Sequence, residues 1–217
     1  MLADWPADND WLNRKRMMLV YGHRGAAGEA PENTIAGFRH AIDRGVRYIE
    51  LDVRLSKDDQ LVVVHDDTVN RTTFHKGRIK LFTAAELSKM DARRDGPPWP
   101  HKRQIGISTL DAVLAATTEI AGYNIEVKAG PKTTMRRIAE ILAEQYNTPT
   151  TGKNIVVTSS DLIFHEALMD IAPHITRGYV SIRPNPFPIV EEYECQYLSI
   201  IGATCNVVFV RHAHKLG

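Results

Sequence analysis

The sequence predicts an α/β fold, a closed βα barrel of the TIM type built by a single domain. Short apolar runs alternate with amphipathic stretches of helical length, which is typical of repeated βα units. Parallel strands joined by helices cross over right-handedly, and seven such units favour a closed barrel over an open doubly wound sheet, the alternative. The chain has 217 residues and 43% are hydrophobic, which is enough for one large domain with a sizeable core.

Seven short apolar runs are the predicted strands. They are bounded by polar or turn-forming residues and are shorter than a typical helix. In chain order they are Met18–Tyr21, Tyr48–Val53, Leu61–Val64, Tyr123–Val127, Ile155–Thr158, Ile175–Val180 and Tyr197–Ile201.

Five helices are predicted between and after these strands. Local chemistry supports their ends: we expect Asn33 to cap the first helix and Gly45 to end it, Ser108 or Thr109 to open the second, and Asp161 to cap the fourth. The predicted helices are Thr34–Arg44, Leu110–Thr118, Thr133–Tyr146, Asp161–Ile171 and Val207–Lys215.

One insertion, at about residues 66–107, interrupts the alternation of strands and helices. It contains its own short helix, Thr83–Met90, which a Thr-x-x-Glu capping box opens. Long loops in compact domains are usually functional, and loops that follow barrel strands lie on the active-site face. We therefore expect residues 1–217 to form one domain whose insertion borders the site.

Composition excludes several classes of function. The net charge of +1 gives no footprint for nucleic acid and no general attraction to anionic membranes. The two cysteines, Cys195 and Cys205, are too few for a disulfide framework and are expected to be reduced thiols. The N-terminal apolar run is too short for a signal peptide or a membrane-spanning helix, so we expect a cytoplasmic protein without a stable membrane anchor.

Ionisable side chains gather where four of the predicted strands end. Residues two apart in a strand point to the same face, so each pair of these groups within one strand shares a face. Because barrel enzymes keep their chemistry at this end of the strands, we expect one site. The residues are His23, Arg24, Glu50, Asp52, His65, Glu126 and Lys128.

The three acids of this set predict a metal site. Buried carboxylates that share a face repel one another unless a cation lies between them, and an all-oxygen set suits Mg²⁺ or Ca²⁺. The alternative is that Arg54, Arg47 or Lys128 pairs with the acids at a strand edge. A metal beside two histidines, an arginine and a lysine points to hydrolysis of a phosphodiester, whose leaving alkoxide needs a proton.

Four stretches of the sequence resemble the glycerophosphodiester phosphodiesterase family. They are GHRG, PENTIAGF, YIELDVRLSKDDQLVVVHDDTVNRTT and NIEVK, and the resemblance runs from about Leu19 to Val180. The family has the βα-barrel fold of the PLC-like phosphodiesterases. The resemblance implies hydrolysis of glycerophosphodiesters to glycerol 3-phosphate and an alcohol, through a cyclic phosphate that water opens.

The resemblance also assigns roles to residues of this chain. It implies that His23 and His65 form the acid/base pair, that Arg24 and Lys128 contact the phosphate, and that a divalent metal, Mg²⁺ or Ca²⁺, binds Glu50, Asp52 and Glu126. Glu32 and Asn33 match the family's Glu-Asn-Thr segment, where we expect them to orient Arg24 or cap the helix. The insertion is expected to shape the glycerol side of the pocket.

The chain departs from the family's pattern in three places. It has GISTL at Gly106–Leu110 where the family has Ile-Pro-Thr-Leu, and TSSD at Thr158–Asp161 where the family has Ser-Phe. It stops at VRHAHKLG, whereas the family continues with one or two further strands. A truncated chain, a rearranged packing or a second protomer would each account for an incomplete barrel, and we expect rearrangement or a homo-oligomer.

Two rival functions remain open at this point. One is a catalytically impaired relative that binds phosphate without turnover, which the departures favour and the complete set of seven polar groups opposes. The other is a phosphodiesterase that acts on lysophospholipids or sugar phosphodiesters.

Overall fold

Six parallel strands form the curved sheet of this protein. The computed structural model describes residues 19–100, 103–146 and 154–216. The strand order is β1-β2-β4-β5-β6-β7, and all five pairings along it are parallel. The bounds are Tyr21–Gly22 for β1, Tyr48–Leu55 for β2, Leu61–Val63 for β3, Gly122–Val127 for β4, Asn154–Ser159 for β5, Arg177–Ser181 for β6 and Tyr197–Ile200 for β7.

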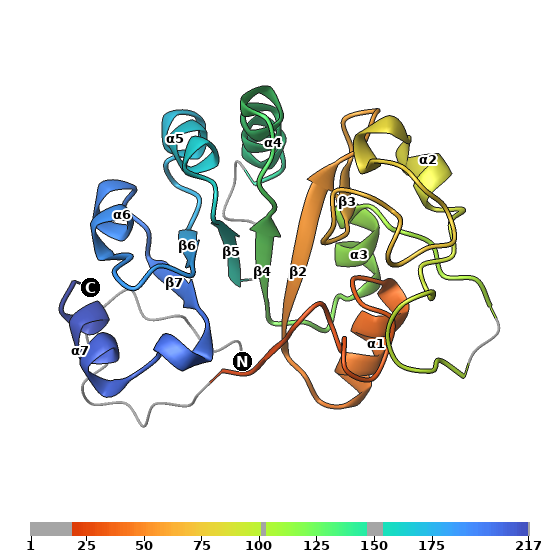
Figure 1. Cartoon of the computed structure of the whole chain (residues 1–217), viewed down its shortest axis with the longest axis horizontal. Coiled ribbons are helices and arrows are strands. Elements are labelled where there is room, and N and C mark those ends of the chain that lie inside the picture. The colour runs from red at the N-terminus through yellow and green to blue at the C-terminus, as the bar shows by residue number, and fades with distance from the viewer. Residues whose placement is uncertain (1–18, 101–102, 147–153, 217) are drawn as a thin grey trace.

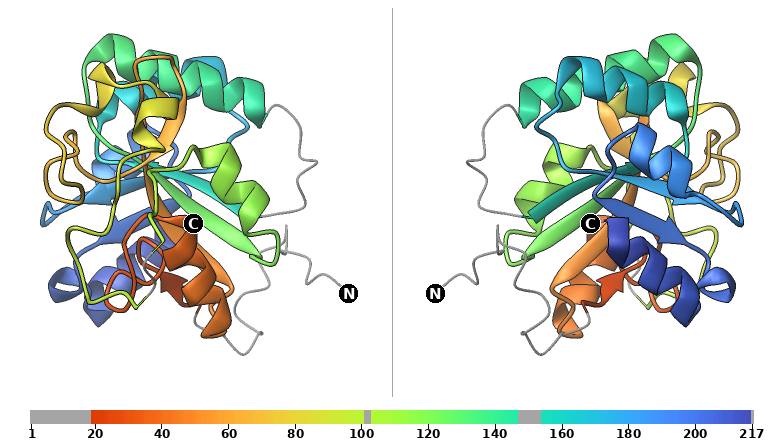
Figure 2. Two further views of the ribbon diagram at one scale, coloured as in Figure 1. Left: turned by 90° about the vertical axis from the view of Figure 1, so that its right-hand side faces the viewer. Right: turned by 90° about the vertical axis from the view of Figure 1, so that its left-hand side faces the viewer.

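The helices stand in an arc around the outside of the strands (Figure 1). Their bounds are Ile35–Asp43 for α1, Ala84–Leu87 for α2, Leu110–Ala116 for α3, Lys132–Gln145 for α4, Leu162–Ile171 for α5, Phe187–Glu192 for α6 and Val207–Leu216 for α7. The predicted βα-barrel fold is confirmed in an incomplete form: the described strands curl into a half-barrel, and β1 and β7 are its edges (Figure 2). The start of the first predicted strand, at Met18, lies outside the described residues.

The third strand corrects one prediction, because β3 is antiparallel to β2 and lies off the barrel path. Only residues 56–60 separate the two strands. A parallel crossover needs about a dozen residues or more, so this short link can form only a hairpin. Its turn is closed by the Ser56 amide, which donates to the Gln60 carbonyl at 2.9 Å, and Asp59 adopts a left-handed φ of 55°.

The two faces of β3 belong to different apolar cores, which attaches the insertion to the barrel. Leu61 and Val63 pack into the main core between the sheet and its helices. Val62 and Val64 pack into a second core beneath the insertion, which includes the buried Leu87 of α2. This division follows from the alternation of side chains along a strand. The insertion is therefore built on β3 and lies along the outer side of the hairpin (Figures 1 and 2).

Most of the predicted helix ends are confirmed. Thr109 caps α3, Asp161 caps α5, and Thr83 and Glu86 form the capping box of α2. The prediction that Asn33 caps α1 is wrong: the hydroxyl of Thr34 accepts from the Gly37 amide, because the Asn33 side chain is engaged elsewhere. One helix, α6, was not predicted from the sequence; it is short and contains proline in its first turn.

Two further expectations concern the thiols and the membrane. Cys195 and Cys205 are both free thiols, the first buried and the second exposed. Across residues 19–100, 103–146 and 154–216, we find no helix with the length and apolar character needed to cross a bilayer.

Candidate active site

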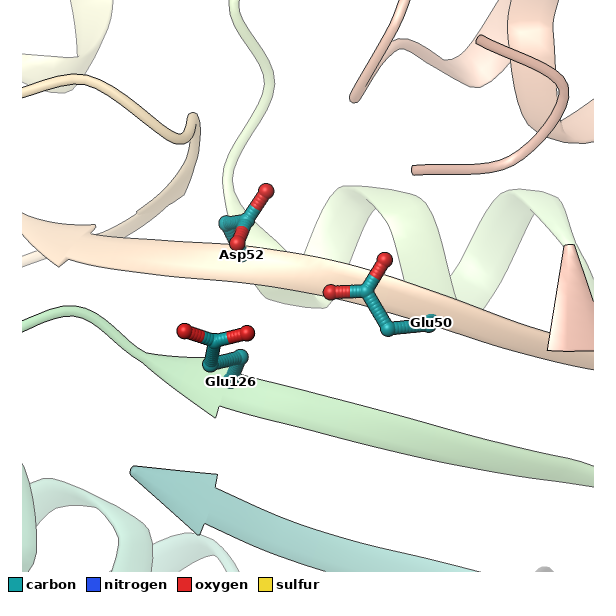
Figure 3. Close-up of side chains that lie close together, drawn as sticks. All are labelled: Glu50, Asp52 and Glu126. Carbon is teal, nitrogen blue, oxygen red and sulfur yellow. The ribbon is translucent and has the colours of Figure 1, made fainter. Parts of the chain in front are cut away.

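Three carboxylates converge on neighbouring strands of the sheet. Asp52 of β2 is paired in register with Glu126 of β4, and Glu50 lies two residues earlier on the same face of β2. Ligand atoms of the three side chains lie within 4.8 Å of one another. Figure 3 shows Glu126 close to both acids of β2. Parallel pairing and residue alternation therefore bring together the acids that the sequence analysis singled out.

Burial makes ionisation of this cluster costly. Glu50 and Asp52 are 8% and 1% exposed. Burial, followed by repulsion from Asp52, raises the pKa of Glu50 to about 8, although a hydrogen bond from the Arg24 amide opposes the shift. Carboxylates in such a position favour a bound cation. Because hard oxygen ligands suit Mg²⁺ and Ca²⁺, the donor set fits the predicted kind of metal.

Arg24 approaches the cluster through both its backbone and its side chain. Its amide donates to Glu50 Oε2 at 2.8 Å, and its Nε lies 3.3 Å from Asp52 Oδ2. The residue follows β1 in a left-handed conformation, with φ of 50°. Gly25 continues this turn with φ of 86°, and a Cβ at that position would lie 2.7 Å from the Phe38 ring. The turn thus directs an amide toward the acids, and only glycine fits its second position.

Lys128 completes the charged rim of the cluster. Its Nζ lies 2.5 Å from Glu126 Oε1 and 3.5 Å from Asp52 Oδ1. Lys128 therefore pairs with two of the three acids, as the alternative to a metal site predicted. Arg54 instead donates to the carbonyl oxygens of His65 and Ala129.

His23 lies at the exposed side of the cluster. Its Nε2 is 3.9 Å from Glu50 Oε2, and its side chain is 69% exposed. Partial burial, followed by the positive charge of Arg24, lowers the pKa of His23. The neutral ring, which can accept a proton, is therefore favoured at neutral pH.

His65 belongs to the segment that follows β3 of the hairpin, and not to the end of a parallel strand. The Val64 amide donates to the Asp52 carbonyl at 2.9 Å, so His65 follows β3 at the level of the acids. The prediction that the strand before His65 runs parallel to its neighbours is wrong, because β3 runs antiparallel to β2. The ring Nδ1 lies 2.8 Å from Asp66 Oδ1.

Asn33 and Glu32 support the site from the loop before α1. The amide of Asn33 pairs with Asp52 at two points: Nδ2 donates to Oδ2 at 2.8 Å, and Oδ1 accepts from the Asp52 backbone amide at 3.2 Å. Glu32 Oε1 accepts from Arg24 Nη1 at 3.2 Å. Glu32 thus lies against the side chain that we expected it to orient.

Two residues of this region were given no role in the sequence analysis. Asp66 contacts His65 directly, and Arg71 binds both Asp66 and Glu32. Asp66 could have been found, because it follows His65 immediately. Arg71 gave no such signal, since an arginine in a long loop is normally solvated.

Comparisons with known proteins show which sequences and which fold the chain resembles. A sequence profile described as the glycerophosphoryl diester phosphodiesterase family matches residues 23–174. A glycerophosphodiester phosphodiesterase of Caldanaerobacter subterraneus is 38% identical over an alignment of 173 residues that covers 74% of this chain and 65% of the relative. One of Bacillus altitudinis is 40% identical over 114 residues, which are 52% of this chain and 46% of the relative. The chain thus spans about half to two thirds of these relatives.

A solved structure extends the similarity to the fold. It is a phosphodiesterase of Oleispira antarctica in complex with its product, sn-glycerol 3-phosphate. The two structures superpose with a TM-score of 0.79 at 25% identity, over 92% of this chain and 81% of the other.

Proposed function

The chain belongs to the glycerophosphoryl diester phosphodiesterase family, and on this premise we propose that it hydrolyses glycerophosphodiesters to glycerol 3-phosphate and an alcohol. The observation that carries the proposal is the cluster of Glu50, Asp52 and Glu126, whose ligand atoms lie within 4.8 Å of one another. The side chains of Arg24, Lys128 and His23 border this cluster. The similarity to a phosphodiesterase solved with glycerol 3-phosphate supports the same substrate class.

The three carboxylates would hold a divalent metal, Mg²⁺ or Ca²⁺, in the proposed enzyme. When bound, such an ion neutralises charge that develops on the phosphoryl oxygens. A bound cation would also favour the charged form of Glu50, whose pKa is raised first by burial and then by repulsion from Asp52. The fit rests on three oxygen donors that two adjacent strands hold in register.

Arg24 and Lys128 are proposed to bind the phosphate. Both side chains are about one fifth exposed and already lie beside the acids, so a phosphate at the cluster is within their reach. Cations fixed in this way stabilise the transition state without having to reorganise.

His23 and His65 are the proposed acid/base pair. One ring accepts a proton from the attacking hydroxyl, and the other donates a proton to the leaving alkoxide. For His65, pairing of Nδ1 with Asp66 at 2.8 Å leaves Nε2 for this exchange. For His23, the exposed ring beside Glu50 is accessible to substrate.

Hydrolysis of glycerophosphocholine and of bis(p-nitrophenyl) phosphate tests the proposal. We expect turnover with Mg²⁺ or Ca²⁺ that EDTA abolishes, and a loss of at least about 100-fold in kcat for His23→Ala and for His65→Ala. Charge reversal in Glu50→Lys should abolish metal binding as measured by calorimetry.

The same assays separate hydrolysis from phosphate binding without turnover. Tight binding of glycerol 3-phosphate without turnover of either substrate would identify a binding protein instead of an enzyme. Unchanged rates in His65→Ala would remove this residue from the acid/base pair.

A further inference from the structure

The guanidinium of Arg71 lies between two parts of the site that come from different loops. We infer that Arg71 is a positioning residue that fixes His65 relative to Arg24. The inference rests on the proposed function, because these two residues are its acid/base group and its phosphate contact. Arg71 itself is assigned no contact with substrate.

Every N–H group of the Arg71 side chain has an acceptor. An arginine side chain offers five donors in a planar fork, and five hydrogen bonds leave this one. Asp66 accepts two of them, at 2.8 and 3.0 Å. Glu32 accepts two, at 2.9 and 2.7 Å, and Asp95 accepts one at 2.8 Å. The guanidinium therefore cannot turn without breaking several charged hydrogen bonds.

The first pair of bonds fixes the carboxylate that holds His65. Asp66 Oδ1 accepts from Arg71 and also lies 2.8 Å from His65 Nδ1. With the carboxylate held at both oxygens, the imidazole plane is held as well. When Nδ1 carries the proton and donates it to Asp66, Nε2 is left free for proton transfer.

The second pair of bonds reaches the phosphate-binding side. Glu32 Oε1 accepts from Arg71 and also from Arg24 Nη1, at 3.2 Å. Arg24 in turn lies 3.3 Å from Asp52. A continuous chain of charged contacts therefore joins the loop after β3 to the loop after β1 through one guanidinium.

Partial exposure of this network limits what its ion pairs add to the stability of the fold. The side chain of Arg71 is 34% exposed, and those of Asp66 and Glu32 are 25% and 16% exposed. Ion pairs that water can reach stabilise a fold only slightly. Precise placement of a proton-transfer group, in contrast, has a large effect on rate.

Turnover of glycerophosphocholine by Arg71→Ala and Arg71→Lys tests the inference. We expect kcat to fall about 10- to 100-fold while KM changes less than about 3-fold, because the lost residue orients groups and does not bind substrate. Lysine should not restore the rate, since one ammonium cannot replace a fork that binds three carboxylates. Added guanidinium chloride at low millimolar concentration should restore part of kcat in Arg71→Ala and none in the wild-type enzyme.

Arg137→Ala is the matched control. Arg137 also bridges two acids, Asp59 at 3.0 Å and Glu140 at 3.3 Å, but it does so on the surface of α4. The kcat of Arg137→Ala should stay within about 2-fold of the wild type, because exposed ion pairs contribute little. If Arg71→Ala behaves like this control, or if Arg71→Lys keeps full kcat, the inference is wrong.

A readout that does not need turnover separates the inference from the proposed function. The Nδ1–H proton of His65, assigned by its absence in His65→Ala, should give a slowly exchanging downfield NMR signal in the wild type. We expect this signal to disappear or move in Arg71→Ala and to persist in Arg137→Ala. An inactive wild type that keeps this pattern would overturn the proposed hydrolysis alone, and an unchanged signal in Arg71→Ala would overturn the inference alone.

Discussion

At the level of single residues, Asn33 shows how much of the site depends on one buried side chain. It is 3% exposed and adopts a left-handed φ of 54°, a conformation that asparagine tolerates better than most residues. Its amide bonds Asp52 at both the carboxylate and the backbone. Asn33 thus adopts an uncommon backbone conformation and also holds Asp52, a proposed metal ligand, in place.

Asn33→Ala should therefore lower the free energy of unfolding by about 2–4 kcal/mol, since it removes two buried hydrogen bonds and places a Cβ-bearing residue without a polar side chain in the left-handed region. Chemical denaturation measures this change. Asn33→Gly removes the same bonds without the backbone strain, so the difference between the two variants reports the strain less the greater entropy of glycine in the unfolded chain. Equal stability of Asn33→Ala and wild type would show that the pairing with Asp52 contributes nothing.

Asp66 gives a prediction about pH. Hydrogen bonding to Arg71, aided by His65, lowers the pKa of Asp66 to about 2 from its usual 3.8. A carboxyl group whose folded pKa is depressed stabilises the fold above its unfolded pKa, and this stability is lost as the pH falls through its folded pKa.

The free energy of unfolding of wild type should exceed that of Asp66→Asn by about 1 kcal/mol near pH 6, because water screens the network. The difference should shrink between about pH 5 and pH 2 and vanish below that range. Urea denaturation across this range measures both variants. A difference that does not depend on pH would mean that Asp66 stabilises the fold by something other than its charge.

The candidate site could be predicted in part from such residues. Glu50, Asp52 and Glu126 were predictable, because alternation follows from local sequence and the helix-containing connection between β2 and β4 favours parallel pairing of these two strands. Arg71 was not, because its three carboxylate partners come together only when two loops meet in space. The roles of these residues stay predictions until the substitutions are measured.

At the level of elements, apolar runs and caps predicted where strands and helices lie but not the direction of each strand. The hairpin of β2 and β3 shows why: the run Leu61–Val63 looks like any other buried strand, and only the five-residue link before it indicates reversal. The cap of α1 is similar. Asn33 and Thr34 are both good capping residues, and the pairing of Asn33 with Asp52 decides that Thr34 is the cap.

The return of the insertion to the barrel is held by close backbone contacts. This return is the GISTL segment, which departs from the pattern of the family. A Cβ on Gly106 would lie 2.0 Å from the Ser88 carbonyl oxygen, so the chain passes directly against the end of α2. The next residue, Ile107, is buried, and the Ser108 carbonyl accepts from the Val63 amide at 2.8 Å. The segment therefore joins the insertion to β3.

Gly106→Ala should lower the free energy of unfolding by about 1–3 kcal/mol, since the backbone must move apart to admit one methyl group. Thermal or chemical denaturation measures the effect. Gly28→Ala is the matched control, because a Cβ on Gly28 meets nothing within 4 Å. The close contact would be refuted if the two alanine variants had the same stability.

At the level of the whole molecule, the curl of the sheet brings its edges toward each other. Burial, followed by interaction with Tyr197, raises the pKa of Tyr21 to about 12. Tyr21 belongs to β1 and Tyr197 to β7, so these side chains of the two edge strands of the described sheet lie near one another. The half-barrel is thus curved enough for residues of many strands to share one interior.

The homo-oligomer expected from the sequence stays a prediction, and the edges of this sheet supply its physical argument. In the described structure β7 pairs on one side with β6, and apolar side chains adjoin the ends of both strands: Ile182 is 80% exposed and Ile201 is 52% exposed. Strand edges with neighbouring apolar surface tend to pair with other chains. Light scattering after size-exclusion chromatography should therefore give about twice the mass of this 217-residue chain. Ser199→Lys places a charge at an exposed position of β7 and should shift the mass toward that of one chain. A wild type with the mass of one chain would refute pairing through this edge.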